Sequence, residues 1–226
     1  MRTIVLLSGG LDSATVLALC RSEGKECHAL SFRYGQRHEA ELAAAARVAR
    51  RQGAASHRVA AIDVACLAGS ALTGGGEVPK GRGEVEIGQG IPATYVPARN
   101  TLFVAHALAL AESTGAAEIA LGINALDYSG YPDCRPEWLS AMQEVARLGT
   151  KVGVLGDPVK LSAPLLAMSK ADIIRAGTAL GVDYAVTLSC YDPAEEGLAC
   201  GACDACVLRR RGFEQAGVPD PTRYVG

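Results

Sequence analysis

The sequence lacks an excess of positive charge. Its 226 residues contain 22 lysines and arginines against 24 aspartates and glutamates, which gives a formal net charge of −2. The sequence pI is about 6.1. Proteins that hold duplex DNA or tRNA electrostatically carry a broad basic field, so this balance argues against nucleic acid as a partner and leaves only a local basic patch open.

Long hydrophobic runs and secretion signals are also missing. No stretch approaches the roughly 18 apolar residues that span a bilayer. The apolar run at residues 3–7 lacks the longer core and the cleavage site of a signal peptide. We therefore expect no membrane partner and a cytoplasmic location.

Strand and helix signals alternate along the chain. Strands are predicted at residues 3–7, 27–32, 58–62, 119–123 and 159–161, and helices at 14–21, 38–51, 101–113, 137–148 and 169–180. This alternation is typical of an α/β fold with an open, mostly parallel sheet and helices on both faces.

Two regions interrupt this pattern. Residues 69–92 contain eight glycines and two prolines with little periodicity, which predicts a long inserted loop, either a lid over a substrate or a floppy insertion. The C-terminal region is rich in cysteine. We expect an α/β domain over residues 1–186 and a small cysteine-rich elaboration over residues 187–226.

A glycine-rich segment follows the first predicted strand, in the order Ser8, Gly9, Gly10, Leu11, Asp12, Ser13. Glycines let backbone N–H groups turn toward an anion, and the start of the next helix adds partial positive charge. The serines can donate hydrogen bonds, and Asp12 can hold Mg²⁺ or cap the helix. The alternative is a tight strand-to-helix turn with an ordinary Ser/Asp cap.

This hexapeptide resembles the S-G-G-x-D-S signature of the PP-loop ATP pyrophosphatases. It is not a Walker A loop, because no Gly-Lys-Ser/Thr follows. The resemblance implies the adenine nucleotide alpha hydrolase-like fold, ATP with Mg²⁺ as cofactors, and transfer of AMP to a substrate oxygen with release of pyrophosphate.

Four of the eight cysteines crowd near the C-terminus: Cys190, Cys200, Cys203 and Cys206. Four thiolates close a tetrahedral structural zinc site, and Gly201 lets the chain turn between two of them. An iron–sulfur cluster, a redox disulfide and chance are the competing interpretations. We interpret Cys20, Cys27 and Cys66 as small buried apolar residues.

Further motifs resemble the QueC family of 7-cyano-7-deazaguanine synthases. They are Phe32-x-Tyr34-Gly35-Gln36-x-His38, Val96 to Asn100, Gly122-x-Asn124, Asp127 to Arg135, and the cysteine tail. The match runs nearly end to end. The phosphate loop is shared across the PP-loop superfamily, whereas the Asp127–Arg135 segment combined with the cysteine spacing indicates this family.

The resemblance implies an ATP-dependent ligase that forms C–N bonds in queuosine biosynthesis. Its substrates would be 7-carboxy-7-deazaguanine, ammonia and ATP. The carboxylate is adenylated and attacked by ammonia to give an amide, and the amide oxygen is then adenylated and lost to leave the nitrile. The substrate is a free base and not tRNA, and a homodimer is expected.

Candidate site residues follow from these motifs. Catalytic roles are expected for Asp12, Ser13, Arg99, Lys170 and His38, with Arg99 as an anion clamp, Lys170 neutralising pyrophosphate and His38 relaying a proton. Substrate contacts are expected from Tyr34, Gln36, Asn124, Asp127, Tyr128, Tyr131, Asp133 and Arg135. A flat, donor-rich ring suits carboxylates that accept its N–H groups and a tyrosine that stacks on it.

The alternatives are a surface position for Arg99, a solvated Lys170, and a solvated turn at residues 124–135. Three other functions compete with nitrile synthesis. A tRNA thiolase-like enzyme would need a reactive cysteine, for which Cys134 is the candidate. A zinc-containing ATP-binding regulator would not release pyrophosphate, and an amide-forming relative would stop after the first activation.

Overall fold

The computed structural model describes residues 1–36, 40–63, 67, 69–74, 76–87, 90–125, 130–194 and 197–225. Five parallel strands form one sheet: β1 (Arg2–Leu6), β2 (Glu26–Arg33), β3 (Ser56–Ala61), β4 (Glu118–Ala120) and β5 (Lys160–Ser162). Their order in the sheet is β3-β2-β1-β4-β5. The predicted open parallel sheet is confirmed.

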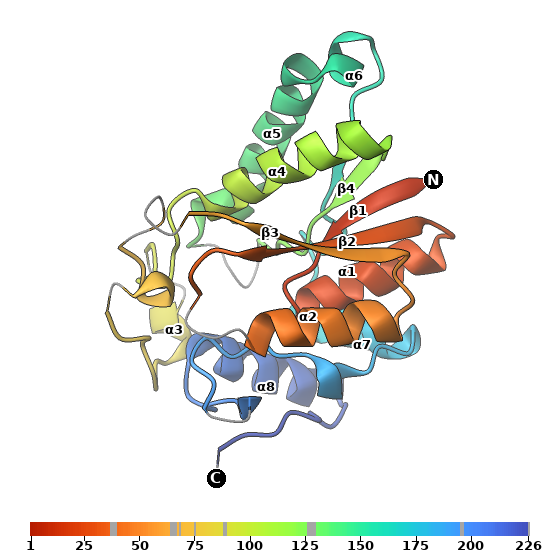
Figure 1. The fold of residues 1–226 in the computed structure, drawn as a ribbon. Coiled ribbons are helices and arrows are strands. Elements are labelled where there is room, and N and C mark those ends of the chain that lie inside the picture. Colours follow the sequence, from red (N-terminus) through yellow and green to blue (C-terminus); the bar gives the residue numbers. More distant parts are fainter. Residues whose placement is uncertain are drawn as a thin grey trace.

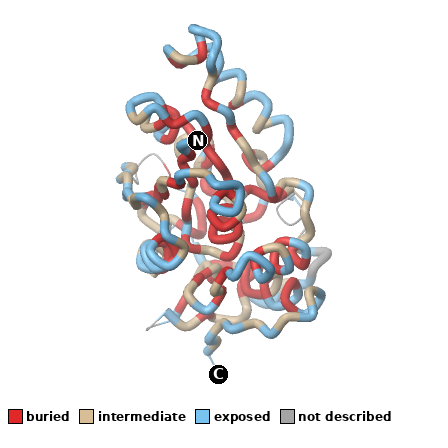
Figure 2. The backbone as a smooth tube through the Cα atoms, turned by 90° about the vertical axis from the view of Figure 1, so that its right-hand side faces the viewer, coloured by how far each residue is buried: buried red, intermediate tan, exposed pale blue. Residues whose placement is uncertain are grey.

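Helices cover both faces of this sheet (Figure 1). One face packs against α1 (Leu11–Ser22), α2 (Ala40–Arg51) and α7 (Lys170–Ala179), and the other against α4 (Arg99–Thr114) and α5 (Pro136–Gly149). Buried residues are concentrated in the interior of the molecule, and exposed residues lie on its outside (Figure 2). Strands buried on both faces explain the continuous apolar run at the N-terminus, where Thr3, Ile4 and Val5 are all buried.

The strand order reverses beside β1, because the chain moves outward through β2 and β3 and then returns to place β4 on the other side of β1. In open α/β sheets, ligands bind at the carboxyl ends of the strands at such a switch point. The segments after β1 and β4 are therefore close neighbours. An ideal Cβ on Gly122, just after β4, would lie only 3.1 Å from the backbone nitrogen of Ser13.

Several helices were not predicted from the sequence. They are η2 (Ala71–Thr73), α3 (Glu84–Ile87), η3 (Pro132–Cys134), α6 (Lys151–Val154), η4 (Tyr184–Val186) and α8 (Asp204–Ala216). The first two lie within the glycine-rich segment, whose backbone also binds the C-terminal region through Gly81 N and Ala202 O at 2.9 Å. Phe213 of α8 is buried in the same apolar cluster as α1 and α7.

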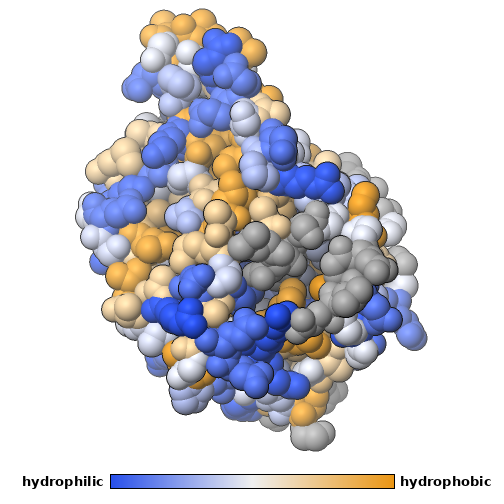
Figure 3. Space-filling view, turned by 180° about the vertical axis from the view of Figure 1, so that it is seen from behind, coloured by the Kyte–Doolittle hydropathy of each residue, from blue (hydrophilic) through white to orange (hydrophobic). Residues whose placement is uncertain are grey.

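The α5–α6 hairpin projects from the sheet and carries an apolar tip (Figure 3). Val154 and Leu155 each expose 73% of their surface there. No helix in the described part of the chain is long and apolar enough to cross a membrane.

Candidate active site

The phosphate loop joins the end of β1 to the start of α1. Gly10 is the N-cap of α1 and, as a glycine, makes no side-chain capping hydrogen bond. The interpretation of Asp12 as a cap is therefore wrong, because Asp12 lies inside the first turn. The two loop serines bind one another through their Oγ atoms at 3.1 Å, and Ser13 Oγ also accepts from Ser8 N at 3.2 Å. These contacts hold the loop in a tight turn around the helix start.

Gly9 fits this turn because it lies against the backbone of α2. Its φ is +87°, and an ideal Cβ there would lie 2.5 Å from Ala45 N and 2.6 Å from Glu41 O. Backbone atoms cannot move aside as a flexible side chain can. The glycine therefore sets how closely the phosphate loop and α2 approach one another.

Replacing Gly9 by alanine should weaken ATP binding about tenfold, because overpacking against backbone costs on the order of 1–3 kcal/mol and displaces the loop. Gly10→Ala is the matched control. Gly10 has φ −82°, and its ideal Cβ would meet Ser8 Oγ at an acceptable 3.4 Å. Isothermal titration with ATP measures both variants, and equal affinities for the two would contradict the role of Gly9.

Asp12 forms an ion pair with Lys170 at the edge of the loop. Lys170 Nζ donates to the two carboxylate oxygens of Asp12 at 2.8 and 3.0 Å. The lysine side chain is only 7% exposed and the aspartate 18%, so the solvated-lysine alternative is wrong. The stem of Lys170 packs against Gly212 of α8, where an added Cβ would lie 2.3 Å from Lys170 Cγ.

A cavity of about 200 Å³ opens beside the phosphate loop, at the carboxyl ends of β1, β2 and β4. Ser8, Gly10, Leu11, Asp12 and Ser13 form one wall. The rest of the lining contains aliphatic residues from the strand ends together with aromatic and polar groups, which include Phe32, Tyr34, Gln36, Glu41, Arg99, Asn100, Phe103, Tyr131, Cys134, Ser189 and Tyr191. A mixed apolar and polar wall of this kind suits a flat heteroaromatic ligand.

Arg99 begins α4 and lines this cavity, so it does not occupy the surface position considered as its alternative. Its Nη1 donates to Tyr34 Oη at 3.4 Å, and its guanidinium lies over the rings of Tyr34 and Phe103. Within the described residues it forms no ion pair with a carboxylate. Ala98, immediately before it, has a left-handed φ of +52° and is the N-cap of the helix.

The other predicted substrate residues divide into two groups. Tyr34, Gln36 and Tyr131 line the cavity, where the Gln36 amide binds Tyr34 N and Phe32 O at 2.8 and 2.9 Å. Asn124, Asp133 and Arg135 do not line it. His38, Asp127 and Tyr128 lie outside the described residues.

Two residues of the second group, Asp133 and Asn124, bind the backbone. Asp133 accepts from the backbone N–H of Asn100 at 3.0 Å and so fixes the start of α4. Asn124 donates to the carbonyl oxygens of Leu165 and Met168, at 2.9 and 2.6 Å. Arg135 is exposed at the N-cap of α5. Their roles as direct ligands stay predictions.

Several residues that line the cavity were not predicted, among them Glu41, Ser189 and Tyr191. Ser189 Oγ accepts from Leu11 N at 3.3 Å, at the start of α1, and from Arg209 Nη1 at 3.3 Å. The flanking Leu188 N donates to Gly9 O at 2.9 Å. The position of Ser189 and Tyr191 on either side of Cys190 is the signal that could have revealed them, whereas a glutamate in an alanine-rich helix looks like an ordinary exposed residue.

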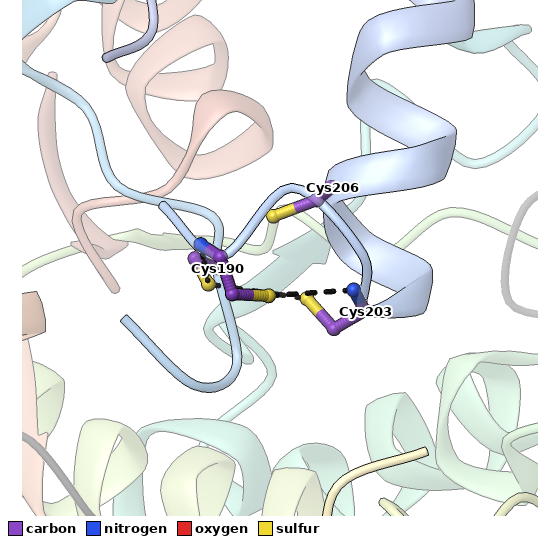
Figure 4. A group of neighbouring side chains, drawn as sticks. Cys190, Cys203 and Cys206 are labelled. Atoms are coloured by element: carbon purple, nitrogen blue, oxygen red, sulfur yellow. Dashed lines mark hydrogen bonds between the residues drawn. The ribbon is translucent and has the colours of Figure 1, made fainter. Parts of the chain in front are cut away.

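The four C-terminal cysteines come together as the sequence predicted. Their sulfur atoms all lie within 4.8 Å of one another, and Cys190 and Cys203 are 4.0 Å apart. Figure 4 shows Cys206 reaching into the group from the first turn of α8. A tetrahedron with zinc–sulfur bonds of about 2.3 Å has edges of roughly 3.8 Å, so the arrangement fits a metal ion.

Backbone N–H groups support this cluster. Cys200 N and Asp192 N donate to Cys190 Sγ at 3.2 and 3.4 Å, and Cys203 N donates to Cys200 Sγ at 3.4 Å. Such hydrogen bonds stabilise thiolates that ligate a metal. Gly201 has φ +75°, as expected for the sharp turn inside the cluster.

Comparisons with solved structures agree with the fold. An NMN synthetase from Francisella tularensis has a TM-score of 0.50 at 19% identity, covering 96% of this chain and 77% of that one. A 4-thiouridine synthetase in an RNA complex with bound ATP has a TM-score of 0.50 at 18% identity, covering 99% of this chain and 47% of that one.

Proteins found by sequence comparison are more similar to this chain than these solved structures are. A 7-cyano-7-deazaguanine synthase of Anaeromyxobacter dehalogenans (strain 2CP-C) is 58% identical over 99% of this chain and 95% of its own length. A 7-cyano-7-deazaguanine synthase of Desulfatibacillum aliphaticivorans is 56% identical over 99% of this chain and 97% of its own length. A family model described as "Queuosine biosynthesis protein QueC" matches residues 2–217. The chain therefore belongs to the QueC family of queuosine biosynthesis proteins.

Proposed function

We propose that this enzyme converts 7-carboxy-7-deazaguanine, ammonia and two molecules of ATP into 7-cyano-7-deazaguanine, AMP and pyrophosphate. The observation that carries the proposal is the 58% identity, over nearly the whole chain, to a protein with that synthase activity in its name. The site supports it, because the phosphate loop and a cavity sized for a flat ring share one wall.

In the first activation, the substrate carboxylate attacks the α-phosphorus of ATP and pyrophosphate leaves. The loop N–H groups and the helix start bind the phosphates, and Lys170 neutralises charge that develops on the pyrophosphate. Asp12 would hold Mg²⁺, which shields phosphate charge when it is bound. Arg99, which has no carboxylate partner among the described residues, would bind the substrate carboxylate.

In the second activation, the amide formed by ammonia attacks a second ATP through its oxygen. Loss of pyrophosphate, AMP and the two amide protons leaves the nitrile. Adenylation is needed because oxide is a poor leaving group and AMP a good one. The same cavity serves both steps, since acid and amide differ only at the reacting substituent.

The cysteine cluster would hold zinc in a structural role. Four protein thiolates complete a tetrahedral site and leave no position open for a substrate. The cytoplasmic location, the homodimer and the lack of a nucleic-acid partner stay predictions.

The protonation state of the Cys134 thiol argues against a thiolase-like role. Burial raises the pKa of this thiol to about 12, with the charge of Asp133 adding to the effect and Arg99 opposing it. A thiol with this pKa stays protonated near neutral pH and is a poor nucleophile.

The proposal is tested by incubating the protein with Mg²⁺, ATP, ammonium and 7-carboxy-7-deazaguanine, with mass spectrometry of the products. We expect the nitrile, with two AMP and two pyrophosphate per molecule formed. Amide as the final product would indicate an enzyme that stops after one activation. No conversion by zinc-loaded protein would contradict the proposal, and thiolation of tRNA would replace it with the thiolase-like function.

A further inference from the structure

A second, small hollow adjoins the main cavity. Its volume is about 20 Å³, and it is lined by Tyr34, Gln36, Glu41, Leu72, Cys190, Tyr191 and Pro193. Five of these residues also line the main cavity, so the two spaces meet at a shared wall. A space of this size holds about one water molecule. Ammonia and the ammonium ion are of the same size as water.

Glu41 is the carboxylate on this shared wall. It is half-buried in the first turn of α2. Within the described part of the chain its side chain forms no hydrogen bond or ion pair. A carboxylate held partly out of water without a partner is unfavourable, and a cation that enters the hollow would relieve this cost.

The groups around Glu41 come from three other segments. Arg99 of α4 lies beyond ion-pair distance and donates to Tyr34 Oη instead. Burial raises the pKa of Tyr34, so its phenol stays neutral. Tyr191 and Cys190 face the hollow from the C-terminal region. Burial also raises the pKa of Glu41 to about 7, and the charge of Arg99 opposes this shift.

The backbone places this carboxylate beside the phosphate loop. An ideal Cβ on Gly9 would lie 2.6 Å from Glu41 O, so the first turn of α2 packs directly on the loop. The hollow therefore adjoins the place where a substrate adenylate would form. A small nucleophile released there has only a short path to the main cavity, because the two spaces share a wall.

We propose that Glu41 and the hollow beside it form the ammonium-binding subsite of this enzyme, with the Glu41 carboxylate accepting one proton from the bound ion. The step rests on the proposed function. Ammonium passes a proton to the carboxylate and becomes neutral ammonia, whose lone pair forms the C–N bond while the bond from carbon to the AMP oxygen breaks. The attacking nitrogen and the protonated Glu41 then lose their protons to solvent.

Steady-state kinetics of Glu41→Gln tests the subsite, because glutamine keeps the shape and removes the charge. We expect KM for ammonium to rise about 10- to 100-fold, as for the loss of a charge-assisted hydrogen bond. KM for ATP and for 7-carboxy-7-deazaguanine should stay within twofold. Glu137→Gln, an exposed glutamate at the start of α5, is the matched control.

The outcomes are separable. If the wild type makes no nitrile, the proposed function fails. If the wild type is active and Glu41→Gln keeps the wild-type KM for ammonium, the subsite is wrong. A rise confined to KM for the deazaguanine would also overturn it, because Glu41 would then contact the ring.

A binding measurement that does not depend on turnover completes the test. Thallium(I) has the charge of ammonium, a similar size and strong anomalous scattering. Crystals soaked in thallium acetate should show an anomalous peak in the hollow against the Glu41 carboxylate, and crystals of Glu41→Gln should lack it. A wild-type crystal without that peak would overturn the subsite. Thermal unfolding of the variant shows that it is folded.

Discussion

Lys170→Met should lower turnover about 100- to 1,000-fold, the cost of removing one group that stabilises charge in a transition state. Methionine retains most of the stem that packs against Gly212, so the fold should persist. We expect the turnover number to fall and not only substrate affinity, because Lys170 Nζ lies at the phosphate loop, where it binds both carboxylate oxygens of Asp12. AMP release under saturating substrates measures the effect.

A matched control shows whether the effect comes from the lysine at the phosphate loop or from the loss of any positive charge. Lys160→Met removes an exposed lysine from β5 that does not line the cavity beside the loop, and it should keep wild-type turnover. The free energy of unfolding should fall by about 1–3 kcal/mol in Lys170→Met, because Asp12 is left without its partner. Turnover within threefold of wild type would show that Lys170 only supports the structure.

Cys203→Ser should abolish the metal site and with it much of the stability of the C-terminal region. Structural zinc contributes folding free energy directly, so we expect the zinc content to fall from one ion per chain to nearly none and the Tm to fall on the order of 10 °C or more. Elemental analysis and thermal unfolding measure the two effects. A chelator should likewise remove the zinc from the wild-type protein and lower its Tm.

The same change should weaken ATP binding, although none of the four clustered cysteines is hydrogen-bonded to the phosphate loop. Cys190 directly follows Ser189, whose Oγ accepts from Leu11 N, and Leu188 N donates to Gly9 O. Loss of the metal would loosen this segment and remove both contacts. Cys20→Ala, a buried cysteine on α1, is the control and should keep its zinc. Full zinc content or iron in place of zinc would contradict the assignment.

Local signals in the sequence accounted for the elements that hold the site. The unbroken apolar run of β1 and the glycines after it predicted a parallel strand followed by a phosphate loop, because both depend on neighbours in the chain. The four cysteines were recognisable from their spacing for the same reason. The helices η2, α3 and α8 were missed, since glycine content and cysteine ligands obscured their periodicity.

Contacts between distant segments could not be predicted in this way. Lys170 and Asp12 are 158 positions apart, and only the packing of α7 against α1 brings them together. Glu41 has the appearance of a solvated residue in an alanine-rich helix, yet the approach of α2 to Gly9 places it in a cavity wall. Ser189 meets Leu11 because the C-terminal region folds back over the loop.

The sequence by itself determined the α/β class, the phosphate loop, the cysteine cluster and the family. The first three depend on residue types at short spacing, where chain geometry alone fixes their relation, and the family on motifs spread along nearly the whole chain. The tertiary structure decided which charged groups are paired and which face the cavity without a partner. That distinction depends on burial and on long-range packing, because a carboxylate such as Asp12 or Glu41 has the same local sequence signal in either state.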